Sequence, residues 1–428
     1  MTTDVDVSLK LHDAVPYPVR SVCARLRNAG FQTVTVGGAV RDVLLGREIG
    51  DWDVATAARP EDVVAVFPRT IPTGIQHGTV TVMMGTEAIE VTTFRGEGAY
   101  TDARRPDHVV FGVPLVEDLA RRDLVVNAMA FDPATGELHD PFGGLADLAA
   151  RRLRAVGPSP DSYVNAVARF SEDGLRVMRT VRFAAVLEFA LDAETERGIG
   201  EPVVLAALAR VSRERVSDEL RKLLAAARPS LGLAIALRTG IVASILPAVA
   251  AAVGDGAAWG ARVDAAAPEA RLGALLADLG AASGTRLDRA LVGHVEKLLR
   301  ALKFSNEELG VAARLVGAAG AARVALDDVA LRRLLSEIGR SVAPTAAALW
   351  NAAGAPELAG RAQVILERGD ALSVGELALG GKELMAALAL APGPGIGKLL
   401  AGLFEQVLVD PALNTPDALL AAARAAPR

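Results

Sequence analysis

The sequence is poor in cysteine and in long uninterrupted apolar runs. Its one cysteine, Cys23, permits no disulfide bond within the chain. The alanine-rich segments are broken by arginine, aspartate or proline well before the roughly 18 residues that a membrane helix requires. The N-terminal stretch MTTDVDVSLK lacks the basic region and apolar core of a signal peptide. We therefore expect a cytoplasmic protein without a membrane segment.

Aromatic side chains, histidines and net charge are also scarce. Aromatic residues make up only 4% of the chain, which argues against recognition of long single strands by base stacking. The five histidines are scattered, so a histidine-rich metal centre for hydrolysis is not expected. The formal net charge is −5, and a nucleic-acid partner would have to be held by local basic patches.

The 428 residues, 51% of them hydrophobic, predict two to four compact units of α+β class. Residues 30–150 show a mixed α/β pattern, whereas the segments from about residue 163 onward have the three- and four-residue apolar spacing of helices only. Strands are expected at 31–36 and 51–56, short helices at 39–46 and 59–67, and a hairpin at 79–94 that turns at Gly85-Thr86. Glycine and proline mark breaks at 157–162, 254–261, 339–344 and 391–397.

Two acids flank Trp52 in the predicted strand at 51–56. Side chains at i and i+2 of a strand share one face, so Asp51 and Asp53 should present both carboxylates together. Magnesium favours one or two carboxylates plus substrate phosphates, and Glu90 on the hairpin would supply a third acid for a two-metal centre. The simpler interpretation is a solvated strand end and an edge-strand charge.

A glycine pair precedes the first predicted helix. Gly37 and Gly38 would let backbone amides and the positive helix end face a phosphate, with Arg41 one turn further adding a charge-assisted contact. A tight strand-to-helix turn is the alternative interpretation. The nearness of this turn to the acid pair favours a nucleotide site with Mg²⁺ as cofactor.

In order along the chain, several motifs resemble those of one family, the bacterial-type (class II) tRNA nucleotidyltransferases, which include CCA-adding enzymes, and their poly(A) polymerase relatives. GGAVRDVLLG and DWDVAT are similar to its catalytic motif, EVTTFRGEGAYTDARRPDHV to its flexible loop, and RRDLVVNAMAFDP to its ribose-selecting motif. DPFGGLADLAARRLRAVG, EDGLRVMRTVRFA and VSRERVSDELRKLL resemble the remaining motifs, so the match spans residues 34–224.

The resemblance implies a polymerase-beta-like nucleotidyltransferase head at 1–150, a helical neck at 151–224, a helical body at 225–335 and a helical tail at 336–428. It implies that Asp51 and Asp53 bind the catalytic metals and that Gly38 and Arg41 bind the triphosphate. The ribose and phosphates of the incoming nucleotide would be bound by Arg122, Asp123 and Asn127. An acceptor such as Asp123 near a 2′-hydroxyl selects ribonucleotides.

Asp173 and Arg176 are expected on one helix face, since residues three apart are neighbours there. A carboxylate acceptor beside a guanidinium donor matches the amino donor and ring-nitrogen acceptor that cytosine and adenine share, and mismatches guanine and uracil. An ordinary i,i+3 salt bridge is the alternative. Arg179 and Arg182 continue the spacing and would reach the triphosphate or form ion pairs within the neck.

The sequence departs from the family pattern at two places. Leu124 and Val125 stand where the family more often has an aromatic residue and a threonine, which leaves Arg122, Asp123 and Asn127 in place. Residues 158–171 make a longer connection than expected, and either shift the base-reading helix or extend a loop.

The expected activity is template-independent addition of the CCA end to tRNA from CTP and ATP, with the tRNA 3′ end as partner and no stable protein partner implied. CC-only addition, A-only addition, poly(A) synthesis and a catalytically silent RNA-binding scaffold remain open alternatives. The full-length loop DARRPDHV argues against a CC-only enzyme, in whose relatives this loop is shortened. Residues 210–222, 286–303 and 392–398 are the candidates for RNA contact.

Overall fold

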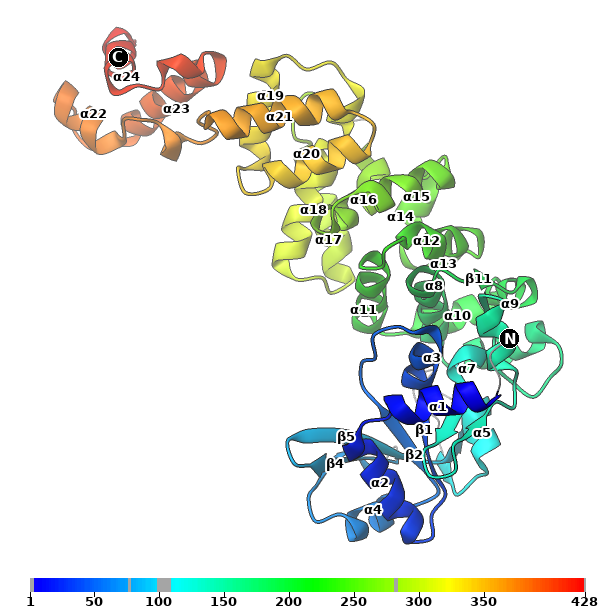
Figure 1. Ribbon diagram of the computed structural model, residues 1–428. Coiled ribbons are helices and arrows are strands. Elements are labelled where there is room, and N and C mark those ends of the chain that lie inside the picture. The colour runs from blue at the N-terminus through cyan, green and yellow to red at the C-terminus, as the bar shows by residue number, and fades with distance from the viewer. Residues whose placement is uncertain (1–3, 76–77, 98–108, 281–283, 427–428) are drawn as a thin grey trace. The chain divides into compact units, whose positions relative to one another are not determined.

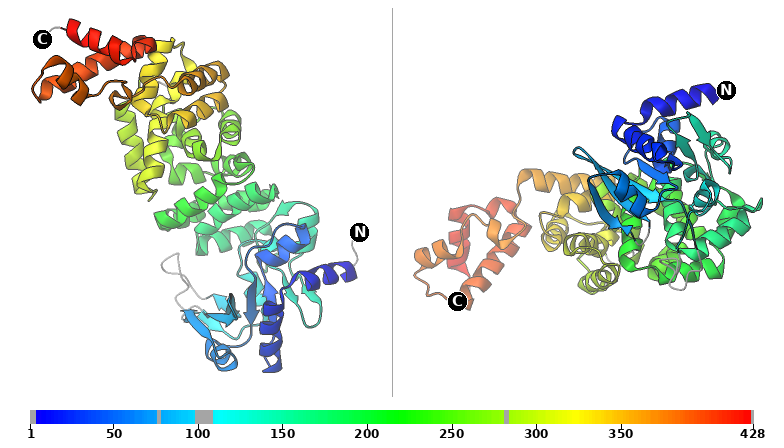
Figure 2. Two further views of the ribbon diagram at one scale, coloured as in Figure 1. Left: turned by 60° about the vertical axis from the view of Figure 1, so that its left-hand side comes forward. Right: turned by 90° about the horizontal axis from the view of Figure 1, so that it is seen from below.

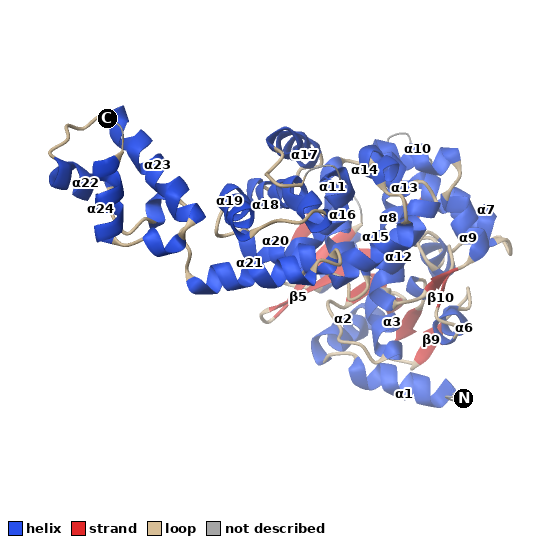
Figure 3. Cartoon of the chain, turned by 90° about the horizontal axis from the view of Figure 1, so that it is seen from above, coloured by secondary structure: helices blue, strands red, loops and turns tan. Residues whose placement is uncertain are grey.

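The computed structural model describes residues 4–75, 78–97, 109–280 and 284–426. The chain divides into two compact units, Met1–Ile245 and Leu246–Arg428. Figure 3 shows that the strands gather in one part of the chain and that the rest is helical. The expected α+β class, a mixed sheet followed by helices, is confirmed. Whether the finer division into head, neck, body and tail holds stays a prediction.

A seven-stranded mixed sheet forms the core of the first unit, with strand order β3-β4-β5-β2-β1-β8-β9 (Figures 1 and 2). β1 pairs antiparallel with β2 and β8, and β2 pairs parallel with β5. The strands are β1 (Thr33–Val36), β2 (Asp53–Thr56), β3 (Thr70–Gly74), β4 (Thr79–Met84), β5 (Glu87–Thr93), β8 (Ala130–Asp132) and β9 (Glu137–His139); β6 (Arg95–Glu97) and β7 (Val109–Phe111) form a separate ribbon.

The local sequence explains the central strands. β1 has the sequence TVTV, and all four of its β-branched side chains are buried, as suits a strand covered on both faces. The β4–β5 hairpin turns at Gly85-Thr86, where Gly85 takes a φ of 67°. The strands predicted at 31–36 and 51–56 correspond to β1 and β2, and the hairpin turns where it was predicted. Asp51 and Trp52 precede β2, so the strand begins only at Asp53.

Short helices cover the sheet. α2 packs against β1 and β2, and α3 packs against β1. The apolar core beneath them combines β1 residues such as Val34 and Val36 with Phe94, Leu119 and Val125. The helices of this region are α1 (Asp4–Ala14), α2 (Tyr17–Asn28), α3 (Gly38–Leu45), α4 (Pro60–Val66), α5 (Leu115–Ala120), η2 (Val125–Asn127) and α6 (Gly144–Ala149). The single cysteine, Cys23, is buried on α2, and burial raises the pKa of its thiol to about 12.

The remaining helices of the first unit surround α8, whose side chains are mostly buried and which packs against α11 and α12. They are α7 (Ser162–Glu172), α8 (Leu175–Leu187), α9 (Ala193–Ile199), α10 (Pro202–Arg210), α11 (Arg213–Leu224), α12 (Pro229–Arg238) and α13 (Ile241–Ile245). Most of the extra segment 158–171 is α7, capped by Asp161 and packed on α9 and α10. It is therefore a helix and not an extended loop.

One expectation for this region is wrong. Residues after 163 were expected to contain no strand, but β11 (Ala190–Leu191) pairs parallel with β10 (Arg152–Leu153). Two residues of apolar alternation are too few for the sequence pattern to reveal such a bridge, which depends on where α8 ends.

The second unit is helical throughout the residues that the structure describes. Trp259 and Trp350 are buried, and each indole N–H donates to a backbone carbonyl, of Leu275 at 2.9 Å and of Ala318 at 3.0 Å. Its helices are α14 (Pro247–Ala252), α15 (Gly256–Ala265), η3 (Pro268–Ala270), α16 (Arg271–Leu276), η4 (Ala277–Gly280), α17 (Arg289–Ala301), α18 (Asn306–Ala318), η5 (Ala319–Arg323), α19 (Asp328–Ile338), α20 (Ala343–Ala352), α21 (Pro356–Arg368), η6 (Val374–Glu376), α22 (Gly381–Leu388), α23 (Pro394–Val409), η7 (Pro411–Leu413) and α24 (Pro416–Ala425).

Two predicted breaks in this unit are shorter than expected. α15 starts at Gly256, within the break predicted at 254–261, because the Asp255 carboxylate caps the helix by accepting from the N–H groups of Ala257 and Ala258. α23 starts at Pro394, within the break predicted at 391–397. Pro at the first helical position explains that start.

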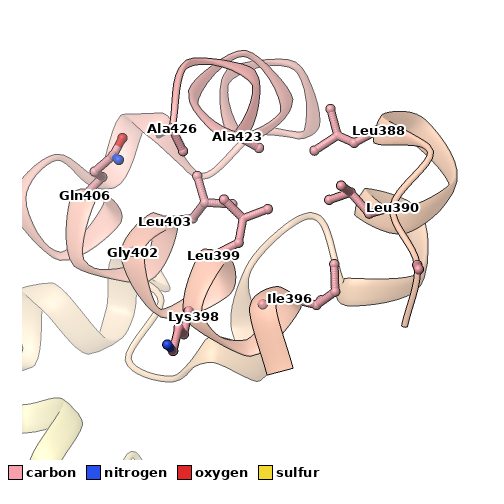
Figure 4. A pocket seen from close by; sticks show the side chains of 12 residues that line it. Leu388, Leu390, Ile396, Lys398, Leu399, Gly402, Leu403, Gln406, Ala423 and Ala426 are labelled. Atoms are coloured by element: carbon pink, nitrogen blue, oxygen red, sulfur yellow. The ribbon is translucent and has the colours of Figure 1, made fainter. Parts of the chain in front are cut away.

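Helices α22, α23 and α24 have an apolar core of their own, which includes Leu384, Leu403 and Leu419. Beside this core lies a cavity of about 520 Å³ lined mainly by leucine and alanine, with Lys398 and Gln406 as the polar side chains (Figure 4). Within the described residues, none of the helices combines the length and the apolar character needed to span a bilayer.

Candidate active site

The acid pair lies where β1 and β2 meet. The antiparallel register sets Val36, the last residue before the glycine pair, opposite Asp53. Trp52 is buried, whereas Asp51 and Asp53 on either side of it are exposed to solvent. The strand-type alternation that we expected therefore holds in burial even though Asp51 lies just outside the strand.

Glu90 is brought beside this pair by the parallel pairing of β2 with β5. Val54 is opposite Val91, so the preceding residues, Asp53 and Glu90, are neighbours. Surrounding protein atoms raise the pKa of Asp53, and the charges of Glu90 and Asp51 raise it further, whereas Arg122 lowers it. In the described residues no group of three His, Cys, Asp or Glu side chains forms a ready metal cluster.

Asp51 and Asp53 remain the candidate metal ligands, with Glu90 as the neighbouring acid. Desolvation and crowding of like charges are both relieved by a bound divalent cation. Magnesium in particular completes its shell with water and substrate phosphates rather than with further protein ligands. Asp51 and Asp53 thus fit such an ion, and Glu90 lies close enough to strengthen the local negative field.

The glycine pair forms the entry to α3. Gly37 is the N-cap with a φ of 78°, a conformation that an L side chain rarely adopts. A Cβ atom there would also lie 2.9 Å from Nη1 of Arg122. Gly37 therefore gives α3 an open N-terminus and lets the Arg122 guanidinium approach it closely.

Arg122 has a demanding environment. Its Nη2 lies 3.5 Å from the buried carboxylate of Asp118, and burial lowers the pKa of the guanidinium against the opposing effect of that acid. Its Nε is buried and has no hydrogen-bond partner among the described residues. A guanidinium with an unused donor next to a helix N-terminus is suited to an anionic ligand.

Arg41 points inward from α3. Its Nε and Nη2 donate to both carboxylate oxygens of Asp42, at 2.9 and 2.8 Å, and its Nη1 donates to Oδ1 of Asn127 at 2.5 Å. The side chain is 8% exposed. The helix that begins at the glycine pair is thereby tied to the ribose-motif segment.

Asp123 extends this hydrogen-bond network from Asn127 to Arg179 on α8. Its Oδ1 accepts from the Leu124 N–H and from Nδ2 of Asn127, both at 2.9 Å, and its Oδ2 accepts from Nε of Arg179 at 2.7 Å. Burial would raise the pKa of Asp123, but Arg179 and Asn127 overcome that effect and hold the pKa well below its usual range. Asp123 therefore stays ionised and links the η2 segment to Arg179 on α8.

The expectation that Asp173 and Arg176 share one helix is wrong. Asp173 is the C-cap of α7, Gly174 follows as the N-cap of α8, and Arg176 lies in the first turn of α8. Asp173 accepts from Arg215 at 2.9 Å and from the Leu175 N–H at 3.0 Å. The spacing rule failed because α7 ends at Glu172 and a new helix begins after Gly174.

Arg176 is held by the end of the preceding helix. Its Nη1 donates to Glu172 at 3.0 Å and to the Arg169 carbonyl at 3.1 Å. The 3.0 Å bond from the Arg176 N–H to the Asp173 carbonyl keeps the two residues in one tight turn. The predicted base-reading pair, Asp173 and Arg176, is therefore held by the turn between α7 and α8 and does not lie on one continuous helix.

Phe183, Glu219 and Asp42 also belong to the site, and the sequence analysis missed them. Arg182 donates to Glu219 on α11 at 2.6 Å, and the guanidinium groups of Arg41, Arg179 and Arg182 all lie over the Phe183 ring. The RF dipeptide at 182–183 was the available signal, but an apolar residue on a helix is ordinarily assigned to the core.

Two further predicted features are the flexible-loop motif and the candidate RNA segment 286–303. Residues 98–108, which contain most of the flexible-loop motif, lie outside the described residues. In the candidate RNA segment 286–303, Arg286 is paired with Glu337 at 2.5 Å. That guanidinium is thus partly neutralised.

Comparisons with known proteins match the whole length of this arrangement. Residues 33–154 match the family model described as "Poly A polymerase head domain". Residues 188–253 match the model described as "Probable RNA and SrmB- binding site of polymerase A", and residues 290–423 match the model described as "tRNA nucleotidyltransferase domain 2 putative".

Similar proteins are found among curated sequences and solved structures. The CCA-adding enzyme of Lactococcus lactis subsp. lactis (strain IL1403) is 37% identical over 414 residues, which cover 94% of this chain and 95% of that protein. The crystal structure of the Bacillus stearothermophilus CCA-adding enzyme in complex with CTP has a TM-score of 0.72 and 32% identity, covering 96% of this chain and 98% of that one. The Thermotoga maritima CCA-adding enzyme complexed with tRNA-CCA shares the fold, with a TM-score of 0.65 and 19% identity, covering 98% of each chain.

Proposed function

The chain belongs to the family of CCA-adding enzymes, the tRNA nucleotidyltransferases, and from this premise we propose that its first unit adds or repairs the 3′-terminal CCA of tRNA with CTP and ATP. The observation that carries the proposal is the β1–β2 register, which sets the acid at the start of β2 opposite the last residue before the glycine turn of α3. A nucleotide triphosphate held at that turn has its reacting phosphate within reach of the acids.

The chemistry is a single displacement at phosphorus. The 3′-hydroxyl oxygen of tRNA forms a bond to the α-phosphorus of the nucleotide, the bond to the bridging oxygen of the β-phosphate breaks, and pyrophosphate leaves while the hydroxyl proton passes to solvent. Divalent metal ions, here proposed to be Mg²⁺ held by Asp51 and Asp53, activate the attacking hydroxyl and offset leaving-group charge in such reactions. The protein positions both reactants.

The triphosphate is proposed to meet the start of α3 and the guanidinium groups around it. Gly37 and Gly38 expose backbone N–H groups, and Arg122 offers the unused Nε donor beside them. Arg41, Arg179 and Arg182 supply further positive charge from α3 and α8. These roles are proposals that rest on geometry and on the family resemblance.

The nucleotide base is proposed to be read by Asp173 and Arg176. Their donor and acceptor pattern suits cytosine and adenine alike, and the α7–α8 junction keeps the two groups at a fixed mutual position. Asn127 and Asp123 face the ribose in this scheme. Both oxygens of Asp123 already accept hydrogen bonds, so it selects the 2′-hydroxyl chiefly through the groups that it orients.

The proposal also covers the remaining features of the protein. Residues 286–303 and 392–398 of the second unit and residues 210–222 of the first unit are proposed to contact tRNA. The cytoplasm is the proposed location because the substrate is tRNA.

The test is an extension assay with purified protein, Mg²⁺ and tRNA transcripts ending at the discriminator base, at C or at CC, with CTP and ATP supplied singly and together. Extension of all three transcripts to CCA is the expected result. Addition of A to the CC-ended transcript alone would identify an A-adding enzyme, addition of C alone a CC-adding enzyme, and a long adenylate tail on other RNA a poly(A) polymerase. Tight tRNA binding without any incorporation would overturn the proposal in favour of a silent scaffold.

A further inference from the structure

The Phe183 ring lies at the centre of an arginine cluster. The guanidinium carbons of Arg182, Arg41 and Arg179 lie 4.1, 4.9 and 5.6 Å from the ring centroid. Phe183 itself is 7% exposed. Arg41 comes from α3 in the sheet region, whereas the other two come from α8, so one ring contacts the guanidinium groups of two elements that are far apart in sequence.

Each arginine of the cluster also has one carboxylate partner. The shortest distances are 2.8 Å from Arg41 to Asp42, 2.7 Å from Arg179 to Asp123 and 2.6 Å from Arg182 to Glu219. Each of the three guanidinium groups at the ring is therefore also paired with a carboxylate. Without such contacts, three long flexible guanidinium side chains this close together would repel one another and lose their order.

The ring and the carboxylates differ in what happens when an anion arrives. A carboxylate competes with phosphate for the same N–H donors, whereas an aromatic face attracts the cation through its quadrupole and leaves the donors at the edge of the guanidinium plane available. An arginine can therefore exchange its acid for a phosphate while it keeps its contact with the ring.

We propose that Phe183 is a positioning residue for nucleotide binding, which holds Arg41, Arg179 and Arg182 in the arrangement that receives the triphosphate. This inference rests on the proposed function and deepens it. Because the ring contacts the arginines proposed for the phosphates, and the base is assigned to Asp173 and Arg176, its effect should be equal for CTP and ATP.

The test compares variants that keep the apolar volume with one that keeps the ring. In F183L the KM for CTP and for ATP should rise in parallel by about tenfold, the size expected from losing cation–π contacts at a partly desolvated site. The kcat should change much less, and the ratio of CTP to ATP use should stay the same. F183Y keeps the aromatic face and should restore both KM values.

F170L is the matched control, since Phe170 on α7 is also a buried phenylalanine of the first unit. It should lower the melting temperature without a change in either KM. Calorimetric titration of CTP in the absence of tRNA gives the dissociation constant directly, and F183L should weaken it by the same factor as the KM. Should F183L not fold, F183M replaces it, because methionine fills similar volume without a ring.

Two results would overturn the inference. One is an F183L enzyme whose KM and CTP dissociation constant stay within twofold of wild type while its melting temperature falls as in F170L. The other is an F183Y enzyme as impaired as F183L. Failure of the wild-type protein to extend tRNA would instead remove the proposed function, so the two failures are distinguishable.

Discussion

Asp53 is a carboxyl group of the candidate site whose pKa is raised. Its pKa is raised first by desolvation and then by the neighbouring carboxylates of Glu90 and Asp51. A carboxyl group whose pKa is raised on folding binds its proton more tightly in the folded state, so its ionised form destabilises the fold at neutral pH and this penalty disappears as the pH falls. A bound divalent cation removes the same penalty without protonation.

The first prediction follows from that sign. In a chelator, D53N should melt at a higher temperature than wild type at pH 7, because the crowded charge is gone. Added Mg²⁺ should raise the melting temperature of wild type but not of D53N, and nucleotide addition by D53N should fall by roughly a thousandfold, corresponding to several kcal/mol of transition-state stabilisation.

Glu87 supplies the control for Asp53. It is exposed at the first position of β5, three residues before Glu90, so E87Q should respond to Mg²⁺ as wild type does. Activity of D53N near the wild-type level would contradict the metal assignment.

The second prediction concerns Asp123, whose pKa is lowered on folding. Its effect on stability therefore changes with pH in the opposite direction to that of Asp53. Burial works to raise the pKa, and the ion pair with Arg179 and the hydrogen bond from Asn127 outweigh burial. The stability that this carboxylate contributes is fully present above its unfolded pKa of about 3.9 and is lost as the pH falls further. D123N should lower the free energy of unfolding by about 2–3 kcal/mol at pH 7, the value of hydrogen bonds to a charged group.

The measurement is chemical denaturation at a series of pH values. The difference in unfolding free energy between D123N and wild type should shrink below about pH 4, because Asp123 then begins to bind a proton in the unfolded chain. A difference that is constant from pH 7 to pH 3 would show that the substitution acts through packing instead.

Individual residues show which parts of the site the sequence could predict. The alternation of exposed Asp51, buried Trp52 and exposed Asp53 agrees with the spacing argument, although β2 itself begins only at Asp53. The partners of Asp123 and Arg182, namely Arg179 and Glu219, lie 56 and 37 residues away in sequence. Such pairs depend on how helices pack, and no spacing rule reaches that far.

Among the structural elements, the α7–α8 junction holds the two residues that are proposed to read the base. Gly174 separates the two helices, and a Cβ atom there would lie 2.2 Å from the backbone nitrogen of Leu208 and 2.3 Å from the carbonyl carbon of Ala207. Backbone atoms cannot move aside as a flexible side chain can. The close approach of α10 therefore requires glycine, and it also explains why the helix predicted across Asp173 is interrupted.

The third prediction is that G174A weakens both the fold and base selection. The melting temperature should fall by several degrees, and the enzyme should incorporate UTP or GTP relatively more often, because Asp173 and Arg176 move apart. Competition assays with all four nucleotides measure the second effect.

The same substitution has the opposite effect where space is open. G310A on α18, where no atom lies within 4 Å of the added Cβ, should stabilise the protein by about 0.5–1 kcal/mol and leave selection unchanged. Unchanged selectivity in a destabilised G174A enzyme would contradict the role assigned to the junction.

At the level of the whole chain, the residues proposed to contact nucleotide all belong to Met1–Ile245, and Leu246–Arg428 has cores of its own. Within this second unit Arg332 on α19 is buried and donates to the carbonyls of Leu408 and Val409 at the end of α23, at 2.6 and 2.9 Å. Its Nη1 lies 3.6 Å from the buried Asp370 carboxylate. The Arg332 guanidinium thus caps the C-terminal carbonyl groups of α23.

The fourth prediction is a separation of the two substrates. R332M leaves the carbonyl of Leu408, in a buried setting, and the part-buried carbonyl of Val409 without their guanidinium partner, which costs about 1–3 kcal/mol for each group, while Asp370 keeps its ion pair with Arg368. The KM for tRNA should rise while the dissociation constant for CTP stays at the wild-type value. Equal loss of CTP binding would show that the second unit is not confined to RNA contact.

R333A is the matched control for this change. The neighbouring Arg333 pairs with Glu405 at 3.2 Å on the exposed surface, where an ion pair contributes at most about 1 kcal/mol. Its removal should leave both substrates nearly unaffected.

The scarcity of cysteine has a practical consequence. Cys23 is buried, and with a pKa near 12 its thiol holds almost no thiolate at neutral pH, so it should resist alkylating dyes in the folded protein. Cysteines introduced by design on the surface would then be the sites that react. The native cysteine therefore does not need to be removed before fluorescent labelling. With a dye on an introduced cysteine in each unit, energy transfer between the dyes would report on tRNA binding.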